Sequence, residues 1–397
     1  MTNFFSVKKI VFIYFLYLIF SYIFLLNLLL SEFPYKYVFT DWLINYEGGF
    51  VRRGLLGQII YKVSIISNLD FKKILFFVQS AGYLLYFVLI INFLNRIKLN
   101  FFWLLLIFST ISFLYPISEL EALGRKDIFV ILLFLIFVQI NFRSLNKFLT
   151  FFLIIFTISC LIHEITFFYL PYYLIIFLYN PQIREKIKFI HLFLILISLI
   201  FLIYLNLLIS NKANINEIIS SYQILNIEIG SNSGAFSWLS KPFINHISII
   251  QNKISLTGIL RFSYVMLINV WIFLYFIKLK NTLSFATITI TSNKIFIGLL
   301  LLAIPMYLIV LDWGRVTYIN FNFMIITIIF FKKEKLIDEN FLQNKIDGMS
   351  IRIKSLMFVL ICILFSPKIL ANDDLSGIPL FKTINKLEGS INLFLFQ

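Results

Sequence analysis

Long apolar stretches, separated by short polar or charged breaks, occupy most of the chain. A helix that crosses a bilayer needs about 20 mostly apolar residues. Eleven stretches fit or approach that length and are predicted to be helices, at 10–30, 74–94, 99–115, 128–142, 148–162, 165–180, 189–209, 262–277, 295–311, 316–331 and 355–371. The pattern therefore predicts an all-α, polytopic integral membrane protein with about 11 transmembrane helices (10–12), forming one transmembrane domain over residues 1–397.

The first stretch begins after Lys8 and Lys9, as a secretory signal does. Its apolar part is longer than the roughly 7–15 residues of a signal-peptide core, and no small-residue cleavage pattern follows it. We therefore expect it to remain as the first transmembrane helix.

The composition agrees with the pattern. Apolar residues make up 60% of the chain and charged residues 13%, and the mean hydropathy is +0.94. Soluble domains are about 45–50% apolar and about 25% charged, so an ordinary soluble domain is excluded. Cys160 and Cys362 both lie inside apolar stretches, which favours packing over a disulfide or a metal site. Frequent Phe, Ile, Leu, Asn and Lys, which AT-rich codons favour, are typical of a low-GC bacterial gene.

The charges divide unevenly between alternate breaks. With the N-terminus in the cytoplasm and one crossing per helix, the cytoplasmic breaks hold 18 of the 34 basic residues but five of the 19 acidic ones. Basic cytoplasmic loops are typical of membrane proteins, so this orientation is predicted. The net charge of +15 is then an orientation signal, and no nucleic-acid partner is expected. Chemistry is expected on the external side, which includes two long loops, 31–73 and 210–261.

The first external loop contains the most distinctive motif, Asp41-Trp-Leu-Ile-Asn-Tyr-Glu47-Gly-Gly-Phe-Val-Arg52-Arg53-Gly-Leu-Leu-Gly57. Arginine suits bidentate contact with phosphate, and glycine permits close backbone approach to a ligand. The segment 55–69 has apolar residues near helical spacing, which predicts an interfacial or re-entrant helix. The alternative is a surface loop whose arginines lie at lipid phosphates.

A second external motif is Glu119-Leu-Glu121-Ala-Leu-Gly-Arg125-Lys126-Asp127, between the third and fourth predicted helices. The basic pair runs against the positive-inside tendency and could contact an anion, with Glu119 or Glu121 in support. The alternative is local: Asp127 would be the N-cap of the following helix and the remaining charges would form an ion pair.

Two further motifs lie in very short external breaks. His163-Glu164 separates two apolar stretches almost without a loop, and an ionisable pair at that depth is costly unless it is paired or faces a polar cavity. Asp312-Trp-Gly-Arg315 again places an acid, a glycine and an arginine together. The alternatives are a water-exposed turn for the first motif and, for the second, a simple Asp–Arg pair beside an interfacial tryptophan.

The second long loop, 210–261, is rich in amides and hydroxyls and holds a few aromatic residues. This composition suits carbohydrate contact and suits an ordinary external loop equally. No histidine spacing typical of a metal site and no nucleotide-binding motif occurs, so no metal or other cofactor is expected.

In architecture, the chain resembles the bacterial membrane polymerases of O-antigen and exopolysaccharide (Wzy-type and EpsG-like proteins) and, more distantly, the GT-C membrane glycosyltransferases. The resemblance covers the many spans, the long external loops and the acid in the first loop. It implies that Asp41 lies where GT-C enzymes place a catalytic acid. It also implies that Arg52, Arg53 and Arg315 correspond to external arginines of the polymerases. The lack of a large soluble C-terminal domain departs from many GT-C enzymes and fits a polymerase better.

These features together predict a polymerase in the bacterial inner membrane. It would join undecaprenyl-diphosphate-linked oligosaccharide units on the periplasmic side, in O-antigen or other surface-polysaccharide synthesis, and could work with a chain-length regulator. A carboxylate would act as general base and arginines would stabilise the leaving phosphate. The candidate catalytic residues are Asp41, Glu47 and Glu164, and the candidate substrate-binding residues are Arg52, Arg53, Arg125, Lys126, Asp127, His163, Asp312 and Arg315.

Three alternatives stay open. One is a GT-C-like transferase that uses a polyprenyl-phosphate sugar. A flippase or transporter is the second, although it should carry ionisable or broken helix sites near the membrane midplane. The third is a non-catalytic assembly or lipid-binding component, which would need no paired acid and base.

Overall fold

A computed structural model describes most of the chain. The described residues are 7–97, 99–112, 115–180, 182–183, 186, 189–209, 213–230, 234–239, 255–280, 283–285, 288–310 and 312–362. The predicted tail beyond residue 371 and the middle of the second long loop, 240–254, lie outside them. The same is true of the last part of the predicted helix 355–371.

The elements are almost all helical. The first half contains α1 (Val7–Glu32), α2 (Tyr37–Thr40), α3 (Gly54–Ser67), α4 (Phe71–Leu94), α5 (Phe101–Phe108), α6 (Tyr115–Ser118), α7 (Leu120–Leu123), α8 (Asp127–Gln139), α9 (Leu145–Ile162), the 3₁₀ helix η1 (Glu164–Tyr169) and α10 (Leu170–Tyr179). The second half contains α11 (Phe189–Tyr204), the π-helical turn η3 (Leu205–Ile209), α12 (Ile215–Ser221), the 3₁₀ helix η5 (Tyr222–Leu225), α13 (Gly234–Leu239), α15 (Leu256–Phe276), the antiparallel strands β1 (Leu283–Phe285) and β2 (Ile288–Ile290), α16 (Ser292–Ile309), α17 (Trp313–Lys333), α18 (Glu339–Asp347) and α19 (Ile351–Cys362).

Each of the eleven predicted stretches coincides at least in part with a helix. Among the described residues, four helices are long and apolar enough to cross a membrane: α4, α9, α15 and α17. The helix predicted over 99–115 is shorter than expected, because α5 ends at Phe108 and a turn at Ser109–Ser112 follows. The structure is thus that of a helical membrane protein.

Helix α17 lies at the centre of the bundle. It packs against α8, α10, α15 and α16, and its side chains are buried along nearly its whole length. The ring of Phe323 stacks on Phe134 of α8, with centroids 4.4 Å apart, and on Tyr169 of η1 at 4.5 Å. Interlocked aromatic rings of this kind hold neighbouring helices in a fixed register.

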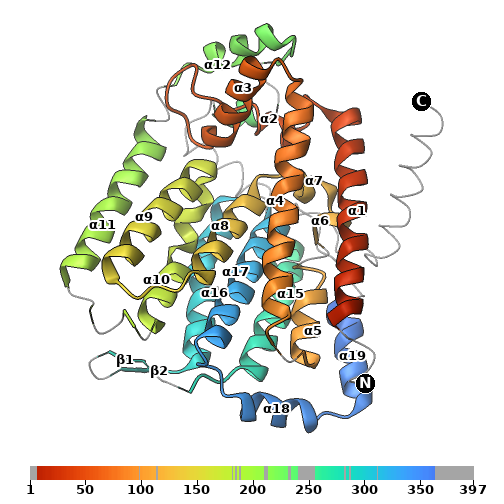
Figure 1. Cartoon of the computed structure of the whole chain (residues 1–397), viewed down its shortest axis with the longest axis vertical. Helices are drawn as coiled ribbons and strands as arrows, with labels where there is room; N and C mark the ends of the chain where they lie inside the picture. Colours follow the sequence, from red (N-terminus) through yellow and green to blue (C-terminus); the bar gives the residue numbers. More distant parts are fainter. Residues whose placement is uncertain are drawn as a thin grey trace.

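The two ends of the bundle differ in character (Figure 1). Helices α2, α3 and α12 gather at one end, and the β1–β2 hairpin and α18 lie at the other. The described parts of the breaks predicted to be cytoplasmic adjoin the hairpin end. The number of membrane crossings and the assignment of each end to a membrane face remain predictions.

The loops at the α2–α3 end form a roof of short helices. Helix α3 begins one residue before the predicted segment 55–69, ends inside it, and packs against α4 and α9. Helix α13 packs against α2, where the backbone N–H of Ala235 donates to Thr40 Oγ1 at 2.8 Å. The buried ring of Tyr222 contacts Tyr61 of α3 at a centroid distance of 5.3 Å. The described part of the second long loop thus covers the first one.

Candidate functional site

A cluster of charged side chains lies beneath this roof. We call it the ion-pair cluster and define it as Asp41, Arg53, Arg125, Lys126, Asp127, His163, Glu164, Asp312 and Arg315. Its members come from four segments that are far apart in the sequence. Each segment lies at a helix end, so the packing of α8, α9 and α17 brings all four together.

Arg53 joins the first segment to the third. Its Nε donates to both carboxylate oxygens of Glu164, at 2.8 and 2.7 Å, and a further guanidinium nitrogen contacts the same carboxylate. On its other side, Nη1 donates to the Tyr37 hydroxyl at 3.2 Å and lies 3.6 Å from Asp41 Oδ1. The guanidinium is therefore held by two groups of partners on different segments.

Lys126 fixes the backbone of the first segment. Its Nζ donates to the carbonyl oxygens of Asp41 at 2.6 Å and Arg53 at 2.8 Å, and lies 3.7 Å from Asp41 Oδ2. The Trp42 indole N–H donates to the carbonyl of Gly124 at 2.7 Å, which ties the same two segments together again. Lys126 was predicted to contact a phosphate, and the structure places its ammonium on backbone oxygens.

His163 and Glu164 lie at the junction of α9 and η1. The His163 ring accepts the N–H of Ile165 at Nδ1, 3.2 Å away, and so caps η1. The same nitrogen lies 3.4 Å from Glu164 Oε2, and Nε2 contacts a guanidinium nitrogen of Arg315. The pair is thus built into the cluster, and the alternative of a water-exposed turn is wrong for His163, which is 4% exposed.

Arg315 connects the start of α17 to α8. Its Nε lies 2.7 Å from Asp127 Oδ2, and Nη1 donates to Asp312 Oδ2 at 2.9 Å. Asp312 also pairs with Arg125 at 3.2 Å. The Asp312–Arg315 pair predicted as an alternative is present, within a larger network.

The alternative prediction, that Asp127 is the N-cap of the following helix, is wrong. Helix α8 begins with Asp127 itself, Lys126 occupies the N-cap position, and no side-chain cap bond is made there. The Asp127 carboxylate instead pairs with Arg315, which lies 188 positions later in the sequence.

Exposure divides the cluster into two layers. The side chains of Arg53, Glu164 and Asp312 are 18%, 19% and 17% exposed. The remaining members are at most 6% exposed. An incoming ligand would therefore meet these three residues first, and the others would support them from behind.

Asp41, the candidate catalytic acid of the first loop, belongs to the buried layer. Its carboxylate is 4% exposed and lies between Arg53 and Lys126. This position suits an electrostatic support better than a base that must reach a substrate hydroxyl.

Two other predicted residues of the first loop lie differently. Glu47 accepts a hydrogen bond from Gln58 at 2.9 Å and pairs with Lys62 at 2.7 Å, both on α3. Arg52 is buried, within electrostatic range of Arg53 and Glu164. Arg52 therefore lies near the cluster, whereas Glu47 contacts α3.

The glycines of the first loop allow the chain to pack on itself. A Cβ at Gly57 would clash with the carbonyl oxygens of Trp42 and Ile44, and one at Gly48 would clash with the carbonyl of Asn214. Gly49 has a φ of +101°, which favours glycine. The glycines were predicted to let the backbone approach a ligand. In the structure they let the first loop pack closely against α3 and the second long loop.

Burial and neighbouring charges shift the titration of the cluster. Burial raises the pKa of Glu164, but the charge and hydrogen bonds of Arg53 outweigh it and hold the pKa well below its usual range. The pKa of Asp312 is lowered in the same way by Arg125 and Arg315 against its burial. Burial, followed by the charge of Arg53, lowers the pKa of His163 well below its usual range. At neutral pH, the site thus holds ionised carboxylates beside a neutral imidazole.

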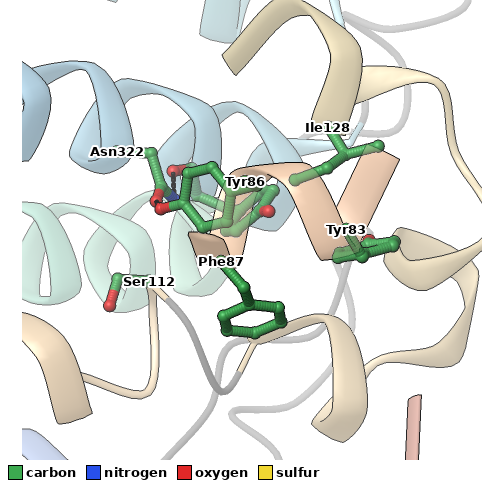
Figure 2. A pocket seen from close by; sticks show the side chains of 7 residues that line it. Tyr83, Tyr86, Phe87, Ser112, Ile128 and Asn322 are labelled. Atoms are coloured by element: carbon green, nitrogen blue, oxygen red, sulfur yellow. Dashed lines mark hydrogen bonds between the residues drawn. The ribbon is translucent and has the colours of Figure 1, made fainter. Parts of the chain in front are cut away.

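A small cavity lies between α4, α8, α17 and the turn after α5. It is lined by Tyr83, Tyr86, Phe87, Ser112, Ile128, Tyr318 and Asn322. Figure 2 shows Tyr86 and Asn322 facing one another, and the Tyr86 hydroxyl donates to Asn322 Oδ1 at 3.0 Å. The cavity volume is about 10 Å³, which is enough for one water molecule and too small for a sugar.

Some residues of the site were not predicted from the sequence. Tyr37 contacts Arg53 through its hydroxyl, and its ring lies 4.8 Å from the Arg125 guanidinium. Gln79 donates to the carbonyls of Leu123 and Arg125 at 2.6 and 2.8 Å and so fixes the corner before α8. A polar residue inside the apolar stretch 74–94 was the available signal for Gln79. Tyr37 is one of 20 tyrosines, and nothing in the neighbouring sequence indicated that it belongs to the site.

Among the described residues, no group of three or more His, Cys, Asp or Glu side chains could hold a metal ion. In comparisons with known proteins, no family model, curated protein or solved structure matches this chain.

Proposed function

We propose that this protein is a membrane glycosyltransferase whose donor is a sugar or oligosaccharide carried on a polyprenyl diphosphate. The observation that carries the proposal is the ion-pair cluster, in which Arg53, Glu164 and Asp312 are partly accessible at one end of the helical bundle. Within this class we favour a polymerase of lipid-linked repeat units, acting on the periplasmic side of a bacterial inner membrane.

A contribution to the free energy of folding does not by itself explain such a cluster. Replacing a buried ion-pair network with apolar side chains of similar volume is often neutral or stabilising. Charged groups that shift one another's pKa values beside an opening are instead typical of functional sites. The cluster is therefore better explained by a charged ligand than by folding.

The residue types suit a phosphate-linked donor. Guanidinium groups bind phosphate oxygens in pairs and remain charged, as Arg53 would need to. Glu164 and Asp312 are the two carboxylates that are accessible enough to accept a proton from an acceptor hydroxyl. Arg53 would stabilise the charge that develops on the leaving diphosphate.

The other candidate functions have less support. A polyprenyl-monophosphate donor would use the same residues and differs by one phosphate. For a transporter, ionisable groups near the middle of the bundle would be expected. The buried polar side chains at mid-length of α17 are neutral, namely Asn320, Asn322 and Thr327.

Deleting the gene in its own bacterium and separating the surface polysaccharide by length tests the proposal. We expect long chains to be lost, and to return with the wild-type gene but not with Arg53→Ala or Glu164→Gln. Glu217→Gln, an exposed acid of α12 at the same end, serves as the matched control and should restore the long chains. Membrane abundance of each variant is measured in parallel. Unchanged polysaccharide in the deletion strain would overturn the proposal.

A further inference from the structure

We propose that the Arg53–Glu164 ion pair is an exchangeable latch: the donor phosphate takes the place of Glu164 on Arg53, and the released carboxylate becomes the general base. The inference rests on the proposed function and deepens it, because it says how the base stays occupied until a donor is bound. Four observations support it.

The first is the geometry of the pair. Arg53 directs two N–H groups, on Nε and Nη2, at the Glu164 carboxylate, and a guanidinium uses the same fork for a phosphate. A carboxylate and a phosphate would therefore compete for one position. Since Glu164 occupies that position in the structure, a phosphate can bind there only by displacing it.

The second is access. Arg53 and Glu164 are the most exposed members of the ion-pair cluster, so the pair can be reached without moving the buried layer. The pairs made by Lys126 and Asp127 are almost fully buried, and their exchange would require the bundle to open.

The third is that Arg53 does not depend on Glu164 for its position. Its Nη1 donates to the Tyr37 hydroxyl at 3.2 Å and lies 3.6 Å from the Asp41 carboxylate. Its carbonyl accepts from Lys126, and its backbone has a φ of 64° at the start of α3. The guanidinium would stay in place when Glu164 leaves.

The fourth is the environment of Glu164 after release. The carboxylate is partly buried beside the neutral His163 ring, at 3.4 Å. Burial raises the pKa of Glu164 and the charge of Arg53 lowers it. Once a phosphate binds Arg53, the lowering effect weakens, so the pKa of Glu164 rises. Donor binding would thus make the carboxylate a stronger base when it is needed.

The chemical step then balances. The acceptor hydroxyl oxygen forms a bond to the anomeric carbon of the donor sugar, and its proton moves to the Glu164 carboxylate. The bond between the anomeric carbon and the phosphate oxygen breaks, and its electron pair leaves with the lipid diphosphate beside Arg53. When the diphosphate departs, Glu164 returns its proton to water and pairs with Arg53 again.

The test is a binding measurement on the full-length protein in nanodiscs, with undecaprenyl diphosphate and, separately, inorganic pyrophosphate as probes. Glu164→Gln removes the competing charge, and we expect it to bind undecaprenyl diphosphate about tenfold more tightly than the wild type. Arg53→Lys, which loses the fork, should bind more weakly, and Glu217→Gln should bind as the wild type does. Pyrophosphate should show the same order of affinities, because the latch recognises phosphate.

Equal or weaker binding by a folded Glu164→Gln variant would overturn the latch. If this variant does not fold, Glu164→Asp replaces it, since the shorter side chain breaks the two-oxygen contact and should raise affinity less. Tighter binding in a protein whose deletion leaves polysaccharide unchanged would keep the exchange but overturn the glycosyltransferase function. Restored polysaccharide without any affinity change would overturn the latch alone.

Discussion

The ammonium group of Lys126 donates a hydrogen bond to the carbonyl oxygen of Arg53 at 2.8 Å. A second bond from the same Nζ reaches the carbonyl of Asp41 at 2.6 Å, so one buried side chain holds both ends of the 41–53 segment. This segment presents Arg53 to the accessible side of the cluster. Lys126 is therefore a positioning residue for Arg53.

Lys126→Met should loosen this segment. The change removes both hydrogen bonds that the ammonium donates to the carbonyls of Asp41 and Arg53, and a hydrogen bond from a charged group contributes about 1.5–3 kcal/mol. We expect faster hydrogen exchange in peptides that cover 41–53 and a lower unfolding temperature in detergent. Lys73→Met, at an exposed position on α4, is the control and should leave exchange in 41–53 near that of the wild type. Equal exchange in the two variants would contradict the role given to Lys126.

Arg315→Met should destabilise the bundle more strongly. Arg315 is 3% exposed and pairs with Asp127 and Asp312, so its removal leaves the buried Asp127 carboxylate without this partner, while Asp312 keeps Arg125. Breaking a buried pair in this way costs about 3–5 kcal/mol. The check is chemical unfolding in detergent, with Arg143→Met as an exposed control that should stay within about 0.5 kcal/mol of the wild type. Similar losses for both variants would show that the network contributes little.

The fold was largely predictable because hydrophobic stretches report burial or lipid contact directly. The helices α4, α9 and α17 begin and end within three residues of the stretches predicted at 74–94, 148–162 and 316–331. The short helices of the roof were harder to predict, because their form depends on contacts with other loops. Helix α13, for example, is anchored through Thr40, which lies 195 positions from Ala235.

The candidate site was predictable in its members but not in its pairings. Acids and arginines in external breaks stood out, because charges there run against the apolar pattern. Which acid meets which base depends on how α8, α9 and α17 pack, and this information is not local in the sequence. Arg125 thus pairs with Asp312, and Glu47 contacts α3 although it lies in the same motif as Asp41.

Gly57→Ala should destabilise the contact between α3 and the first loop. The added methyl group would meet the carbonyl oxygens of Trp42 and Ile44, which are backbone atoms with little freedom to move. We expect a loss of about 1–3 kcal/mol, as for overpacked sites. Gly298→Ala in α16 is the matched control, since nothing lies within 4 Å of the added Cβ and a helical alanine should stabilise by about 0.5–1 kcal/mol. Chemical unfolding of both variants in detergent measures the difference, and a loss at Gly298 as large as at Gly57 would contradict the packing argument.

Acid should weaken the protein partly through Asp312. Its pKa is lowered in the folded state by Arg125 and Arg315, which outweigh the effect of burial, so the folded state binds the proton less readily than the unfolded chain. The stability that Asp312 contributes is therefore complete above the unfolded pKa of about 3.9 and is lost as pH falls through the lower folded value. Unfolding temperatures between about pH 5 and pH 2 should fall less steeply for Asp312→Asn than for the wild type. Asp347→Asn, exposed at the opposite end, should follow the wild-type curve, and parallel curves for all three proteins would contradict the assignment.

The orientation of the bundle can be measured with cysteine labels. Cys160 and Cys362 are buried, so they should give little background with a membrane-impermeant maleimide. Glu228→Cys lies in the described part of the second long loop and Asn340→Cys lies on α18, and both positions are exposed. Because the basic breaks adjoin the α18 end, we expect Glu228→Cys to react in right-side-out vesicles and Asn340→Cys to react in inside-out vesicles. The reverse result would place the ion-pair cluster on the cytoplasmic face and exclude a periplasmic donor site, whereas the expected result would place Arg53 and Glu164 on the side where lipid-linked units are polymerised.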